Sequence, residues 1–144
     1  MEARGRRTVL VVDDQQDIRL MCRVNLALEG YEVLEAADGQ AGLSLIREHR
    51  PDLVLLDVMM PGVDGWQVLD IVKSDPELAS IPVVLLTARV QREDELRGWN
   101  AGVADYLSKP FNPSTLTQVV HRVLVVDDPE ARRRRAIEKL SILR

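Results

Sequence analysis

Acidic, hydroxyl and cationic side chains follow several short apolar runs of this sequence. The residues concerned are Asp13, Asp14, Asp57, Thr87 and Lys109. Three carboxylates brought together would repel one another and raise their proton affinities unless a cation lay among them. Carboxylate oxygens of this kind suit Mg²⁺, which binds a few of them and keeps several waters. If the fold gathers these residues, the sequence therefore predicts a magnesium site.

The same residues are the parts needed to accept a phosphoryl group. An ionised aspartate can attack phosphorus while a metal ion and a lysine neutralise charge on the phosphoryl oxygens. The hydroxyl of Thr87 can donate to the transferred group, so that a covalent event pulls on the loop after this residue. For Asp13 and Asp14 taken alone, a pair of residues that begins a helix remains an alternative.

The elements that must position these residues alternate between strand and helix along the chain. The predicted strands are Thr8 to Val12, Tyr31 to Glu35, Leu53 to Leu56, Val83 to Leu86 and Asp105 to Leu107. Segments of helical period lie between them, which favours a parallel sheet covered by helices on both faces. Five such units account for residues 8 to about 126. The carboxyl ends of parallel strands meet at one edge, so the candidate residues are expected to gather there.

The stretch VLVVDD occurs twice, at Val9 to Asp14 and at Val123 to Asp128. The first copy follows polar residues and precedes a helix, so we interpret it as a buried strand that delivers two carboxylates. The second continues an apolar stripe of helical period from Leu116, so we predict a fifth helix that ends near Val126. Too few residues follow for a second domain of this kind. We expect a tail at 1–7, one domain at 8–126 and an extension or linker helix at 127–144.

The composition is that of a globular domain rather than a disordered or membrane protein. The chain has 144 residues, of which 46% are hydrophobic and 29% charged, and a formal net charge of −4. No apolar run approaches bilayer length, and the single cysteine permits no internal disulfide. We therefore expect a cytoplasmic protein without membrane contact. The negative charge argues against nucleic-acid binding over the whole surface.

Four stretches resemble the receiver domains of two-component response regulators, the CheY-like family. They are VLVVDDQQDI at 9–18, PDLVLLDVMMPGVDGWQVL at 51–69, IPVVLLTA at 81–88 and AGVADYLSKPF at 101–111. The resemblance spans about 8–126 and implies a flavodoxin-like (βα)5 fold with strand order 2-1-3-4-5. It also implies a phosphoacceptor that serves a histidine kinase or phosphotransfer protein and a downstream protein partner or output domain. Homodimerisation on phosphorylation is a further possibility that the resemblance raises.

The resemblance assigns a role to each candidate residue. It implies that Asp57 is the phosphoacceptor, with Mg²⁺ held by Asp13, Asp14, Asp57 and the backbone carbonyl of Met59. The phosphoryl group would contact Thr87 and Lys109. Such a domain is not a stand-alone enzyme, although it is expected to assist its own phosphorylation and dephosphorylation.

The resemblance also assigns roles in switching and in the lifetime of the phosphate to further residues. Lys109 and Pro110 are expected to share a cis peptide bond. Tyr106 would be the switch aromatic that moves inward with Thr87, which makes the surface of helix four, strand five and helix five the expected output face. An aromatic on a half-buried edge strand is the simpler interpretation of Tyr106. Met59 and Arg89 occupy the positions that the family uses to tune phosphate lifetime.

Other functions fit the sequence less well. A phosphatase of the haloacid dehalogenase type needs a second aspartate two residues after the nucleophile, where this chain has Met59. A flavodoxin-like electron carrier would place a flavin phosphate against the acidic DDQQD. A receiver-shaped scaffold that is never phosphorylated remains an alternative. In the C-terminal segment, Arg132 to Arg135 favour a solvated basic face, with attraction to an acidic partner or nucleic acid as the other interpretation.

Overall fold

The computed structural model describes residues 6–88 and 91–143. Its strands are parallel and form one sheet in the order β2-β1-β3-β4-β5, which confirms the predicted topology. The strands are β1 (Thr8–Val12), β2 (Glu32–Ala36), β3 (Leu53–Asp57), β4 (Val83–Thr87) and β5 (Asp105–Ser108). The three central strands are almost wholly buried, as expected of strands that are covered on both faces.

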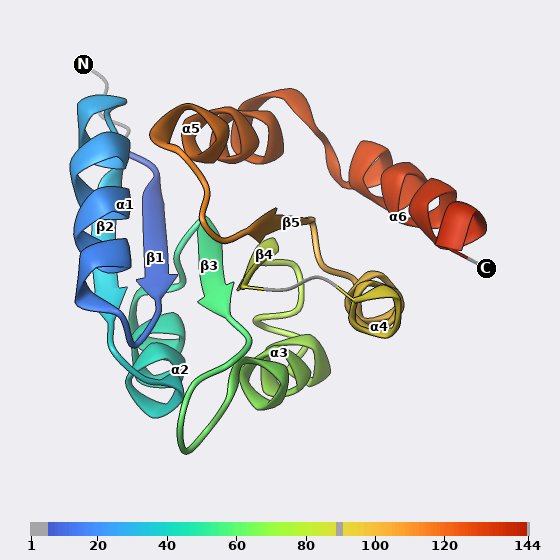
Figure 1. Cartoon of the computed structure of the whole chain (residues 1–144), viewed down its shortest axis with the longest axis horizontal. Helices are drawn as coiled ribbons and strands as arrows, with labels where there is room; N and C mark the ends of the chain where they lie inside the picture. The colour runs from blue at the N-terminus through green and yellow to red at the C-terminus, as the bar shows by residue number, and fades with distance from the viewer. Residues whose placement is uncertain (1–5, 89–90, 144) are drawn as a thin grey trace.

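Helices cover both faces of this sheet (Figure 1). They are α1 (Gln16–Leu28), α2 (Gly39–His49), α3 (Gly65–Ser74), α4 (Arg92–Ala101) and α5 (Pro113–His121). One apolar cluster contains side chains of α1 and α5, and the other contains side chains of α2, α3 and α4. Alternate residues of the central strands enter opposite clusters, so the sheet forms the boundary between them.

The second copy of VLVVDD is not a strand. After α5 ends at His121, residues Arg122–Val126 form a π-helical turn, η1, and the chain then becomes extended at Asp127. Val123 is buried in the cluster of α1 and α5, whereas Val125 and Val126 are exposed. The helical segment therefore ends at Val126 as predicted, although its last five residues form a wider turn than an α-helix and its buried apolar side ends at Val123.

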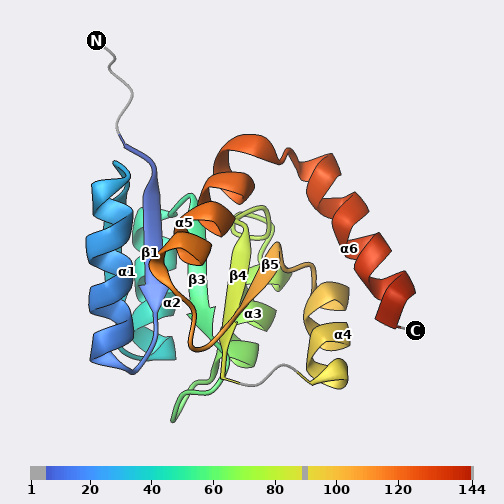
Figure 2. The same ribbon diagram turned by 45° about the horizontal axis from the view of Figure 1, so that its top comes forward.

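A further helix, α6 (Pro129–Leu143), follows η1 and lies beside α4 at the β5 edge of the sheet (Figure 2). It begins where Asp128 accepts the N–H of Ala131 at 2.7 Å, an N-terminal cap. The expected C-terminal extension is thus helical and is packed on the domain. Across the described ranges, each helix is too short or too polar to cross a lipid bilayer.

Candidate functional site

The buried strand β3 delivers Asp57 to the carboxyl edge of the sheet. All five residues of this strand are buried, and Asp57 itself is 3% exposed. Helix α3 starts close by, through a capping box between Asp64 and Gln67. Gly65 allows this approach, because a Cβ atom there would lie 2.2 Å from the carbonyl oxygen of Asp57. The first turn of α3 therefore fixes the backbone next to the candidate phosphoacceptor.

The three predicted carboxylates lie together. Oxygens of Asp13, Asp14 and Asp57 are all within 4.8 Å of one another, and Asp13 is fully buried whereas Asp14 is exposed. Asp13 also accepts the N–H of Gln15 at 2.9 Å, but Gln15 and not Asp13 occupies the N-cap position of α1. The alternative of a simple helix start does not explain a buried Asp13 that faces Asp57. Oxygen ligands at this spacing, one of them open to solvent, fit Mg²⁺.

The ammonium group of Lys109 enters this cluster from the segment after β5. Its Nζ lies 2.7 Å from Asp13, 3.4 Å from Asp57 and 2.9 Å from the side-chain oxygen of Gln15. Burial alone would lower the pKa of Lys109, but its hydrogen bonds and charge attraction to the two aspartates outweigh burial and raise that pKa. Lys109 therefore remains a cation in the pocket, where it can meet an incoming anion.

Asp57 is harder to ionise than an ordinary aspartate. Burial raises its pKa from 3.8 to about 6, and the neighbouring charge of Asp13 acts in the same direction. A hydrogen bond of 3.0 Å from the Met59 N–H and the charge of Lys109 partly oppose this increase. The pocket thus holds a carboxylate whose charge is incompletely compensated by its protein neighbours.

Thr87 ends β4 beside these carboxylates. It is 4% exposed, it is one residue beyond the partner of Asp57 in the sheet register, and it is paired with Ser108 of β5. The Lys109 N–H donates to its carbonyl oxygen at 2.7 Å. The peptide bond between Lys109 and Pro110 is cis. The ends of β4 and β5 are therefore joined at the site.

Of the two positions predicted to tune phosphate lifetime, only Met59 lies among the described residues. Met59 is 74% exposed, and its backbone N–H is bound to Asp57. Arg89 lies outside the described residues. The lifetime roles of both remain predictions.

Tyr106 of β5 is attached to α4. Its hydroxyl donates to the carbonyl oxygen of Asp94 at 2.5 Å, and its ring makes an edge-to-face contact with Trp99 at 5.8 Å between centroids. Burial raises the pKa of the phenol, and the nearby charges of Glu95 and Asp94 act in the same direction. Tyr106 is thus half-buried on the edge strand, as in the simpler interpretation, and packs against α4, while its role as a switch stays a prediction.

Gly98 makes room for this contact. A Cβ atom at Gly98 would lie 1.8 Å from the Tyr106 hydroxyl oxygen and 2.6 Å from the adjacent ring carbon. Gly98→Ala is therefore expected to expel the ring from α4 and to lower the free energy of unfolding by about 1–3 kcal/mol. Urea unfolding measures this change.

The matched control removes the ring first. In a Tyr106→Ala background, Gly98→Ala should be neutral or stabilising by about 0.5–1 kcal/mol, because alanine favours a helix over glycine. An equal loss in both backgrounds would contradict a steric role of Gly98 toward Tyr106.

Two residues of this neighbourhood were not expected to matter. The side-chain oxygen of Gln15 accepts a hydrogen bond from the ammonium of Lys109, and Gly98 leaves space for the ring of Tyr106. The glutamine follows the aspartate pair directly, so its position could have suggested a place at the site. The glycine lies inside a helical segment, where glycine lowers helix stability. A glycine at such a position could have suggested that a neighbouring side chain needs the space.

Comparison with known proteins extends this description. The family model described as "Response regulator receiver domain" matches residues 9–121. The phosphate regulon transcriptional regulatory protein PhoB of Pseudomonas aeruginosa is 39% identical over 118 residues, or 82% of this chain and 52% of that protein. The DNA-binding response regulator MtrA of Mycobacterium tuberculosis is 38% identical over 125 residues, or 87% of this chain and 54% of that protein.

Solved structures show a similar relation. The chemotaxis protein CheY4 of Vibrio cholerae superposes with a TM-score of 0.79 at 36% identity, which covers 83% of this chain and 100% of that chain. A putative response regulator from Chloroflexus aurantiacus gives a TM-score of 0.78 at 36% identity, which covers 83% and 98%. The chain spans about half the length of the curated relatives it matches, but nearly the whole of these solved chains.

Proposed function

Because this chain belongs to the family of response regulator receiver domains, we propose that it accepts a phosphoryl group on Asp57 and passes the signal on through its surface. The observation that carries this proposal is the position of Lys109, whose ammonium lies between two buried aspartates at the carboxyl edge of the sheet. A cation and a nucleophilic carboxylate are thereby held where a phosphoryl group could be bound by both. The proposed receiver unit is 8–126, with 127–144 as its extension.

The proposed residues for Mg²⁺ are Asp13, Asp14, Asp57 and the backbone carbonyl of Met59. The spacing of the carboxylates and the raised pKa of Asp57 support this assignment, since a divalent ion would offset the repulsion among them. When bound, the ion would neutralise charge on the phosphoryl oxygens.

The chain's own residues would carry the covalent step. An oxygen of the Asp57 carboxylate attacks phosphorus and forms a new P–O bond, while the bond from phosphorus to the donor's leaving group breaks and its electron pair leaves with that group. Lys109 would offset the negative charge of the transferred group. The Thr87 hydroxyl would then donate to one of its oxygens, which pulls the end of β4 toward Asp57.

In this proposal the domain is a signalling module, not a stand-alone enzyme. Its donor would be a histidine kinase or phosphotransfer protein, and its target a downstream protein or an output domain. Loss of the phosphate would require water to attack the aspartyl phosphate. The exposed Met59 side chain offers no acid or base for that reaction, in contrast to a phosphatase with an aspartate at the same place.

The first test uses a small phosphodonor. With Mg²⁺ and acetyl phosphate, intact-mass spectrometry should show one added phosphoryl group per chain, because transfer to the chain releases acetate as the leaving group. Chelation of Mg²⁺ with EDTA should suppress this addition, because the three carboxylates then lack a divalent counterion. A protein that stays unmodified with Mg²⁺ would favour the alternative of an unphosphorylated binding scaffold.

A further inference from the structure

Helix α6 packs along α4, at the β5 edge of the sheet (Figure 2). Ala136, Leu140 and Leu143 of α6 are half-buried and pack against the apolar cluster that contains Trp99 of α4. Their spacing of four and three residues places them on one face of the helix. Residues of α6 on other faces, such as Ile137 and Ile142, are exposed. One apolar stripe of α6 therefore lies on the domain.

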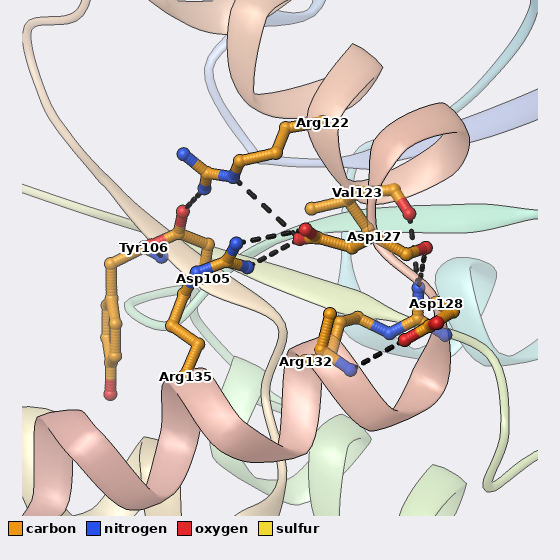
Figure 3. A network of polar contacts seen from close by, with 9 residues as sticks. Asp105, Tyr106, Arg122, Val123, Asp127, Asp128, Arg132 and Arg135 are labelled. Atoms are coloured by element: carbon orange, nitrogen blue, oxygen red, sulfur yellow. Dashed lines mark hydrogen bonds and ion pairs between the residues drawn. The ribbon is translucent and has the colours of Figure 1, made fainter.

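Charged groups fix the start of α6 (Figure 3). Arg135 binds the carboxylate of Asp127 through two nitrogens, at 2.5 and 3.0 Å, and that carboxylate is only 5% exposed. Arg122 of η1 lies 3.9 Å from the same carboxylate and pairs with Asp105 at the start of β5. Two-point binding of this kind fixes orientation as well as distance. The network therefore connects β5, η1 and α6.

This arrangement overturns the expectation of one solvated basic face over Arg132–Arg135. Arg132 donates to the carbonyl oxygen of Val123 at 3.1 Å, and Arg135 is held by Asp127. Arg133 and Arg134 remain exposed. Successive residues of a helix point in different directions, so the run divides between an inward and an outward side.

The attachment of α6 buries little apolar surface. No residue of the described helix is fully buried. A cavity of about 290 Å³ lies between its first half and the domain, with Lys73, Arg132, Arg133 and Ala136 among its lining. Release of α6 would thus expose few apolar side chains and would leave the two main clusters intact.

The far end of α6 is bound to the first residue of α4. Arg92, the first residue of α4, donates to the carbonyl oxygen of Leu143 through two nitrogens, one of them at 2.5 Å. Arg92 follows Thr87 by five positions. Because this separation along the chain is short, a displacement of Thr87 on phosphorylation is expected to affect the start of α4 and its contact with α6.

We propose that α6 is an intramolecular occupant of the surface of α4 at the β5 edge of the sheet, and that its docked state opposes phosphorylation of Asp57. Phosphorylation moves the start of α4, weakens the contact with α6 and exposes the surface to a downstream protein. The effect is reciprocal, so release of α6 favours phosphorylation. The coupling rests on the proposed phosphoacceptor function, whereas the docking of α6 does not.

The test compares matched pairs of variants in the full chain. Leu140→Glu places a charge in the packed stripe of α6, and Ile142→Glu places the same charge on its exposed side. Arg135→Gln removes the partner of Asp127, and Arg134→Gln removes an arginine that is exposed on the same helix. Amide hydrogen exchange over 129–143 reports docking, because a helix of 15 residues is marginal in water by itself. Intact mass after addition of Mg²⁺ and acetyl phosphate gives the phosphorylation rate.

The proposal expects α6 amides to be protected in the unmodified protein and in both control variants. Leu140→Glu and Arg135→Gln should each reduce that protection by at least about tenfold. They should also raise the initial phosphorylation rate about fivefold, which is at the lower end of typical allosteric coupling. Phosphorylation of the unchanged protein should likewise reduce the protection of α6.

Unprotected α6 amides in the unmodified protein would overturn the docking itself. Loss of protection in Leu140→Glu with an unchanged phosphorylation rate would overturn the coupling. A chain that never takes up a phosphoryl group would overturn the proposed function and the coupling with it, and hydrogen exchange would still decide whether α6 occupies this surface.

Discussion

Asp57→Asn is expected to give a folded protein whose phosphorylation by acetyl phosphate falls by at least about 100-fold. The amide nitrogen or oxygen that replaces the carboxylate oxygen is a far weaker nucleophile, and the carboxylate pair that Lys109 contacts is reduced to Asp13 alone. Intact-mass spectrometry after a fixed incubation with Mg²⁺ and the donor measures the loss. Circular dichroism of the same sample checks that the fold is retained.

The control for this variant is Asp70→Asn. Asp70 is exposed on α3 and lies outside the carboxylate cluster, so the same chemical change there should leave the rate within about twofold. A phosphoryl adduct that persists at full level in Asp57→Asn would show that another side chain is modified. It would remove the basis of the proposed function.

The gathering of carboxylates could be predicted because it depends on topology. Once β1 and β3 are identified as parallel neighbours, Asp13 and Asp57 must end at the same edge of the sheet. The strand from Tyr31 to Glu35 was predicted one residue too early, since the structure places it at Glu32–Ala36. An apolar or β-branched run identifies a strand, but the hydrogen bonds to its neighbours determine where pairing begins.

The contacts of individual side chains could not be predicted in the same way. Lys109 lies closer to Asp13 than to Asp57, a preference set by the path of the segment after β5 and not by residue type. Likewise, the docking of α6 depends on which helix face meets α4 in space. The sequence of Arg132–Arg135 does not indicate that Arg135 pairs with Asp127, because this ion pair arises from the turn between η1 and α6.

The raised pKa of Asp57 predicts an unusual dependence of stability on pH. In the folded chain this pKa is about 6, compared with an ordinary value of 3.8. Above pH 6 the carboxylate is ionised in both the folded and the unfolded state, so the folded state bears the full cost of a buried charge. As the pH falls from 6 to 3.8 the folded state takes up a proton first, and this cost is relieved. At about 1.4 kcal/mol per pKa unit, the cost at pH 8 is roughly 3 kcal/mol.

Asp57→Asn should therefore stabilise the protein at pH 8 in EDTA, by about 1–3 kcal/mol in urea unfolding. The gain should not exceed the full cost, because the pKa of about 6 already includes the opposing effects of the Met59 N–H and of Lys109. Near pH 4.5 the advantage should shrink to about 1 kcal/mol or less, because the folded unchanged protein is then largely protonated at Asp57. Asp70→Asn, as the control, should show no such dependence.

Magnesium should offset the cost of the buried Asp57 charge by binding to the folded state. At pH 8, Mg²⁺ at about 100 times its dissociation constant is expected to stabilise the unchanged protein by about 2.7 kcal/mol, because it binds the folded carboxylate cluster and not the unfolded chain. Asp57→Asn lacks one of the three carboxylates and should gain much less at the same concentration. A variant that is less stable than the unchanged protein in EDTA at pH 8 would contradict the argument. It would mean that Lys109 already compensates the charge of Asp57, and that the cluster needs no divalent ion.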